Sequence, residues 1–305
     1  ADLRFHDDGT VSLCVGAQAM GQGHLATYPA LIAQRLGIDV SRVKLVAGDS
    51  GQTPGIVATV ASRSTMMVGS AAALACDESI RRGLALAAQH LEAALEDVHF
   101  QNGLYTVAGT DRSVHLLDLT RLSKANKASN QVALASLDNV AKFTSPSMTY
   151  PNGCHVCEVE IDPDTGHVEV VAYTAVDDVG VMLQPQVIEG QIMGGVAQGL
   201  GQALGERLRY DPQGQLLTGS FMDYPMPRAD TVPAMVIAHH SVPCRTNPLG
   251  VKGAGESGVA GSLPSAMNAV LHALSYAGVS ALDMPFTSER VWQALQTAQA
   301  AQRRA

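Results

Sequence analysis

Residues 155–173 have the sequence HVCEVEIDPDTGHVEVVAY, which predicts two strands joined by a tight turn. In the first half, polar and apolar residues alternate in two sets: His155, Glu158 and Glu160 against Val156, Val159 and Ile161. Residues 162–166 combine Asp, Pro and Gly, which is typical of a turn, and a second strand is expected over residues 168–173.

A helix is predicted to follow over residues 187–207, although it contains five glycines. A glycine inside a helix costs about 1 kcal/mol relative to alanine, so something must offset the loss. A glycine also lets another backbone or a ligand come very close, because it has no Cβ. The glycines concerned are Gly190, Gly194, Gly195, Gly199 and Gly201.

Strands and helices also alternate in runs elsewhere in the chain. The other expected elements are a strand at 10–15, a helix at 25–36, a strand at 43–47, a helix at 65–95, a hairpin turn at 102–103, and helices at 263–278 and 289–303. This order favours an α+β fold with mixed sheets and packed helices over a doubly wound sheet. We expect residues 1–305 to form one composite unit of two α+β subdomains. Because Ala1 leads directly into strand-like sequence, we expect the chain to begin within a larger fold.

The composition excludes several classes of protein. Of 305 residues, 46% are hydrophobic and 16% are charged, with a net charge of −8. This charge argues against binding to nucleic acid or to an anionic membrane, and no apolar run is long enough for a membrane span. Five cysteines are too few for a disulfide scaffold, so we expect a reducing, cytoplasmic location. A surface this poor in charge predicts that partner chains cover part of it.

The first candidate site is Gly21-Gln22-Gly23-His24, at a junction between a strand and a helix. Free N–H groups at a helix start can bind a polar or anionic ligand, and the Gln22 amide can both donate and accept. A purely structural turn is an equally good interpretation. We expect His24 to cap or pack against the helix rather than to bind a metal.

The second candidate is residues 59–65, with the sequence TVASRST, before the Ala-rich helix. Its hydroxyl groups, Arg63 and the helix N-terminus could bind a phosphate. The alternative, which the sequence leaves open, is that Ser64 or Thr65 only caps the helix.

Gln198 and Glu256 are the remaining candidates. Gln198 lies among glycines on an otherwise apolar helix, so we expect it to be partly buried and hydrogen-bonded. Glu256 is the only carboxylate in a long apolar and glycine-rich stretch, so its surroundings should be dry, as suits a general base. The alternative for Glu256 is a salt bridge with Lys252. Cys154 and Cys157 have CxxC spacing, but they lie in a predicted strand, which disfavours a metal or redox site.

In order along the chain, these segments resemble the molybdenum hydroxylase family, the large subunits of xanthine dehydrogenases, aldehyde oxidoreductases and carbon monoxide dehydrogenases. The resemblance covers most of the chain. It rests on residues 20–24 (MGQGH), 48–50 (GDS), 61–64 (ASRS), 158–162 (EVEID), 165–166 (TG), 190–191 (GQ), 198–201 (QGLG), 223–227 (DYPMP), 247–253 (NPLGVKG), 255–256 (GE) and 284–287 (MPFT).

The resemblance implies a role for each candidate residue. The turn Gly21-Gln22-Gly23 would contact the dithiolene of molybdopterin. Ala61, Ser62, Arg63 and Ser64 would hold the phosphate of the cofactor or its cytosine dinucleotide. Gln198 would bind the pterin side, and Glu256 would be the base that faces the metal. No residue of this chain would ligate molybdenum itself.

The resemblance implies the second of two molybdopterin-binding domains, of the xanthine dehydrogenase/aldehyde oxidase type. The Gly-Gly-Phe-Gly loop of the first domain has no match here, so a companion chain should supply it. Iron–sulfur clusters, and in some members FAD, would lie on other subunits. The implied reaction is hydroxylation of a C–H carbon of an N-heterocycle or aldehyde, with water as the oxygen source. Leu25 and Ser257 depart from the xanthine type. Alternatives are half of a carbon monoxide dehydrogenase large subunit and a non-catalytic assembly module.

Overall fold

The computed structural model describes residues 1–53, 55–128 and 136–303, in two compact units. The first unit comprises Ala1–Thr149, Val181–Gln184 and Pro243–Gly253. The second comprises Tyr150–Gly180, Pro185–Val242 and Ala254–Ala305. Together they contain mixed sheets and packed helices, so the α+β prediction is confirmed.

The first unit is built on a four-stranded sheet. Its order is β3 (Val43–Ala47), β2 (Val11–Val15), β1 (Asp2–Phe5) and β7 (Asn139–Val140). Strand β1 pairs antiparallel with β2, whereas β2 and β3 are parallel. Helices α1 (His24–Leu36) and α2 (Ser70–His90) bury apolar faces in the core that Leu3 and Leu13 of the sheet share. The expected strands and the first helix are therefore present at their predicted positions.

A smaller sheet and a third helix complete the first unit. Strands β4 (Val98–Gln101), β5 (Leu104–Val107) and β6 (Ser113–His115) form an antiparallel meander, followed by α3 (Leu116–Ala128). The predicted hairpin turn is confirmed, because Asn102 and Gly103 both have positive φ, 48° and 82°.

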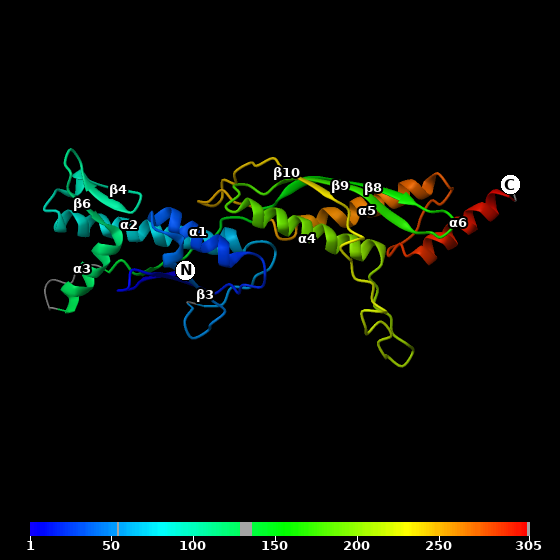
Figure 1. The fold of residues 1–305 in the computed structure, drawn as a ribbon, viewed down its shortest axis with the longest axis horizontal. Coiled ribbons are helices and arrows are strands. Elements are labelled where there is room, and N and C mark those ends of the chain that lie inside the picture. The colour runs from blue at the N-terminus through cyan, green and yellow to red at the C-terminus, as the bar shows by residue number, and fades with distance from the viewer. Residues whose placement is uncertain (54, 129–135, 304–305) are drawn as a thin grey trace. The chain divides into compact units, whose positions relative to one another are not determined.

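The second unit is a three-stranded sheet with helices on one face. Its order is β10 (Met235–His239), β9 (Val168–Asp178) and β8 (Asn152–Ile161), in which β9 pairs antiparallel with β8 and parallel with β10. Helices α4 (Pro185–Leu204) and α5 (Ser257–Ser275) run side by side along this sheet (Figure 1). Helix α6 (Ser288–Gln302) packs Val291 and Leu295 near Leu274 of α5.

Glycines let the backbones of α4 and α5 touch. The glycine spacing in α4 predicts such a close approach of another backbone. A Cβ added to Gly195 would lie 2.8 Å from the backbone nitrogen of Val259, and one added to Gly258 would lie 2.3 Å from the carbonyl oxygen of Ile192. These distances are too short for any side chain, so the contact offsets the helix-propensity cost of the glycines.

His155 lies on the buried face of β8, where Tyr173 and Asp177 give the imidazole polar partners, whereas Val156 on the other face is 52% exposed. Two sequence predictions need correction. Helix α5 begins at Ser257 rather than near Leu263, since Gly258 packs on α4 instead of breaking the helix. Helix α2 ends at His90 rather than Leu95, because Glu92 has a φ of 50°.

Among the residues that the structure describes, none of the helices combines the length and the hydropathy that a bilayer span requires.

The helix contact can be tested with two adjacent glycines. Gly195→Ala should lower the free energy of unfolding by about 1–3 kcal/mol, since its methyl group would have to separate α4 from α5. Gly194→Ala is the control, because a Cβ there meets no atom of the described residues within 4 Å. This control should leave stability unchanged or raise it by up to about 1 kcal/mol. Equal urea midpoints for the two variants of the purified chain would contradict the backbone contact.

Candidate functional site

The Gly-Gln-Gly segment is a turn that its own glutamine holds together. Gly21 and Gly23 have φ values of 101° and 82°, which favour glycine, and Gly23 is the N-cap of α1. Gln22 Nε2 donates to the carbonyl of Gln18 at 2.8 Å, and Gln22 Oε1 accepts from the N–H of Met20 at 2.6 Å. Oε1 can accept one more hydrogen bond and Nε2 can donate one more, so Gln22 can both shape the turn and bind a ligand.

The second predicted segment is joined to this turn. Thr59 Oγ1 donates to the same Gln18 carbonyl at 3.1 Å. Beyond it, Ala61 and Ser62 both have positive φ, 54° and 50°, which costs non-glycine residues energy. Gly253 packs on this loop, because a Cβ at Gly253 would lie 2.4 Å from the carbonyl oxygen of Ser62. The first unit thus brings together three of the segments that carry the resemblance.

The loop ends in buried donors without partners. Arg63 Nε and Ser64 Oγ are both buried and have no hydrogen-bond partner within the described part of the chain. Ser64 occupies the N-cap position of the following helical turn, but its backbone is helical and its side chain makes no capping bond. The capping alternative therefore does not describe Ser64. Each unsatisfied buried group costs about 1–3 kcal/mol, so these donors suit a ligand with acceptor oxygens.

His24 packs, as predicted. Its side chain is 3% exposed and stacks on Tyr28, with ring centroids 4.6 Å apart and an interplanar angle of 26°. Burial lowers the pKa of His24, which favours the neutral imidazole.

In the second unit, Gln198 and Glu256 lie on either side of the contact between α4 and α5. Gln198 follows Gly195 by one helical turn, and Glu256 is the N-cap residue of α5, two residues before Gly258. Both side chains are exposed in this chain, so the expected burial of Gln198 and dry surroundings of Glu256 are wrong. The reason is that α4 turns Ile192, Val196 and Leu200 toward the core, and that α5 begins earlier than the sequence suggests.

The CxxC pair lies in strand β8. Cys154 is exposed and pairs with Val176, whereas Cys157 is half-buried and pairs with Tyr173. Burial raises the pKa of the Cys157 thiol to about 11. No group of three or more His, Cys, Asp or Glu side chains in the described ranges could hold a metal ion.

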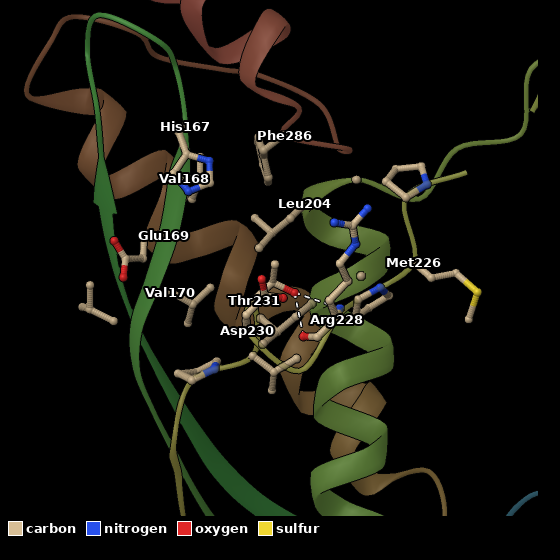
Figure 2. A pocket seen from close by; sticks show the side chains of 18 of the residues that line it. His167, Val168, Glu169, Val170, Leu204, Met226, Arg228, Asp230, Thr231 and Phe286 are labelled. Carbon is tan, nitrogen blue, oxygen red and sulfur yellow. Dashed lines mark hydrogen bonds between the residues drawn. The ribbon is translucent and has the colours of Figure 1, made fainter. Parts of the chain in front are cut away.

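A pocket of about 770 Å³ in the second unit is lined by none of the candidate cofactor-binding or catalytic residues (Figure 2). Val168, Val170, Leu204 and Phe286 form its apolar side, while Arg228 and Asp230 come from the segment that leads into β10. Three motifs of the resemblance, residues 198–201, 223–227 and 284–287, contribute to this lining, and they are a sequence signal that could have indicated it.

Alkylation of the native chain tests this description of the cysteines. At pH 8, about one Cys157 thiol in a thousand would be ionised, so exposed Cys154 should react well before Cys157, which should react only as the pH approaches 11. Cys76 is the internal control, because burial raises the pKa of its thiol to about 12 and it should stay unlabelled while the chain is folded. Peptide mass spectrometry reads the order of labelling. Joint protection of Cys154 and Cys157 would instead indicate a metal or a disulfide.

Known proteins resemble this chain over almost its whole length. The carbon monoxide dehydrogenase large chain of Hydrogenophaga pseudoflava is 36% identical over 297 residues, covering 96% of this chain and 36% of its own length. The nicotine 6-hydroxylase large subunit of Paenarthrobacter nicotinovorans is 34% identical over 298 residues, again covering 96% and 36%. The solved structure of reconstituted CO dehydrogenase from Oligotropha carboxidovorans superposes with a TM-score of 0.90 at 32% identity, covering 98% of this chain and 37% of that one.

The chain therefore spans little more than a third of the length of these relatives. A family model described as "Molybdopterin cofactor-binding domain" matches residues 1–233. This match covers most of the chain, and the chain belongs to the molybdopterin cofactor-binding domain family.

Proposed function

We propose that this chain is the second molybdopterin-binding part of a molybdenum hydroxylase. The enzyme would hydroxylate a C–H carbon of an N-heterocycle or aldehyde with water as the oxygen source. The observation that carries this proposal is the pair of buried donors at Arg63 and Ser64, which have no hydrogen-bond partner among the residues that the structure describes. These donors follow a strained loop that is hydrogen-bonded to the turn around Gln22.

These residues fit a cofactor that bears a phosphate group. An arginine N–H and a hydroxyl can both donate to phosphate oxygens, and the open positions of the Gln22 amide can bind the polar edge of a pterin. We assign Ala61, Ser62, Arg63 and Ser64 to the phosphate, in the cytosine dinucleotide form of molybdopterin. Gly21, Gln22, Gly23 and Gln198 would bind the pterin itself. When bound, the cofactor supplies molybdenum as a two-electron acceptor.

Glu256 is the proposed general base. Its carboxylate is exposed at the start of α5, so its Oε atoms can reach a ligand outside the chain. We propose that this carboxylate accepts the proton of the water-derived nucleophile as the C–O bond forms.

The rest of the enzyme would be supplied by partners. Since the relatives are almost three times as long, we propose a companion chain that carries the first molybdopterin-binding domain. Electrons would pass to iron–sulfur centres on other subunits, with FAD on a further subunit in some assemblies. Exposed apolar side chains such as Phe221 and Met222, at 84% and 92%, support covering by partner chains. The five free cysteines support a cytoplasmic location.

A carbon monoxide dehydrogenase of this family is the second candidate. One observation favours it, namely that the 36% identical relative is a carbon monoxide dehydrogenase large chain. Oxidation of carbon monoxide by the purified complex, without oxidation of heterocycles or aldehydes, would select this candidate.

Two substitutions in the purified complex should separate cofactor binding from catalysis. Glu256→Gln should keep the molybdenum and pterin content and lose turnover by a factor of about a thousand or more, since an amide cannot accept the proton. Arg63→Met should reduce molybdenum and pterin content about tenfold, whereas turnover per molybdenum should change little.

Molybdenum by mass spectrometry, pterin fluorescence and turnover are the three measurements. Arg81→Met is the matched control, because Arg81 is 71% exposed and pairs only with Glu78 on the surface of α2 among the described residues. Wild-type turnover of Glu256→Gln would remove Glu256 from the mechanism. Full molybdenum content in Arg63→Met would remove Arg63 from the cofactor site.

A further inference from the structure

A buried hydrogen-bonded network in the second unit, the His155 network, has no part in the proposed function so far. It consists of His155, Tyr173, Asp177 and Ser265. His155 of β8 and Asp177 of β9 have side chains only 5% and 3% exposed. His155 Nδ1 lies 2.7 Å from the hydroxyl of Tyr173, which lies 3.0 Å from Ser265 Oγ of α5. His155 Nε2 lies 3.4 Å from both carboxylate oxygens of Asp177. The His155 network connects two strands of the sheet with α5.

The chemistry of these groups fixes the direction of the hydrogen bonds. A carboxylate only accepts, so the N–H at His155 Nε2 donates a hydrogen bond to the Asp177 carboxylate. In a neutral imidazole the other nitrogen then accepts, and the Tyr173 hydroxyl donates to Nδ1. With a group bound at both of its nitrogens, the ring of His155 cannot rotate.

Helix α5 rests directly on this ring. A Cβ added to Gly261 would lie 2.4 Å from His155 Nδ1, and its three nearest atoms would all belong to the imidazole. The ring therefore sets how closely α5 approaches the sheet at Gly261. Glu256 precedes Gly261 by five residues, or about 7.5 Å along a helix. A shift of α5 at Gly261 would thus move the carboxylate of Glu256.

We infer that His155, held by Tyr173 and Asp177, is a positioning residue for Glu256. It takes no part in proton transfer and acts by fixing the first turns of α5 (Ser257–Ser275). This inference rests on the proposed role of Glu256, whereas its structural part concerns α5 alone.

Tyr173→Phe is the most conservative test, because it keeps the aromatic ring and removes the hydroxyl that joins His155 to Ser265. In the loaded complex, kcat should fall about tenfold, with KM within about twofold and molybdenum content unchanged. In the full chain without cofactor, hydrogen exchange at residues 257–261 should become about tenfold faster.

Tyr276→Phe is the matched control. Tyr276 is 80% exposed and forms a 3.2 Å hydrogen bond with His272 Nε2 at the other end of α5, so this variant should change neither kcat nor the exchange of residues 257–261. Wild-type kcat and wild-type exchange in Tyr173→Phe, beside an inactive Glu256→Gln, would overturn the inference. An active Glu256→Gln variant would instead overturn the proposed role of Glu256 as the base. The hydrogen-exchange data would still decide whether the His155 network fixes α5.

A second pair of variants keeps the test independent of Tyr173. Gly261→Ala should reproduce the loss of kcat and the faster exchange, because its methyl group would collide with the imidazole. In a His155→Ser background the same methyl group should have little further effect on the exchange of residues 257–261. Additive effects of the two substitutions would contradict direct contact between the ring and the helix.

Discussion

The backbone contact between α4 and α5 is the constraint on which the second unit depends. Gly195 and Gly258 leave no room for a Cβ, so the two helices meet at backbone distance. This contact fixes the start of α5, where Glu256 lies, against α4, which carries Gln198 one turn beyond Gly195. The His155 ring then supports α5 from the side of the sheet. Helix α5 thus makes two close contacts, with α4 at Gly258 and with the His155 imidazole at Gly261. Together they define where α5 begins and where the carboxylate of Glu256 lies.

The first unit differs in that its loops carry hydrogen-bond donors for a ligand. The Gln18 carbonyl accepts from both Gln22 and Thr59, so one backbone oxygen joins two loops. Positive φ at Ala61 and Ser62 costs stability, and so does Arg63 Nε, which is buried without a hydrogen-bond partner in the described part of the chain. A cofactor that satisfies these donors would recover part of that cost. This balance accounts for a loop that is strained but held in place on two sides.

Local patterns predicted most of the fold, because strands, turns and helices depend on short-range periodicity. The glycine spacing of α4 even predicted a close backbone approach, although not its partner. Burial was predicted less well, since it depends on which face packs against which neighbour. Gln198 proved exposed because the opposite side of α4 faces the core, and Gly258 is part of a helix because α4 lies against it. The His155 network was missed because its hydrogen-bonded pairs are 18 to 92 residues apart in sequence.

We propose that this chain binds molybdopterin as part of a larger enzyme. The most direct test is to isolate the native complex through this chain and to measure its molybdenum, iron and pterin together with its polypeptides. We expect about one molybdenum and one pterin per chain, with iron and a companion molybdopterin-binding chain. An intact complex with its companion chains, but without molybdenum and pterin, would contradict it.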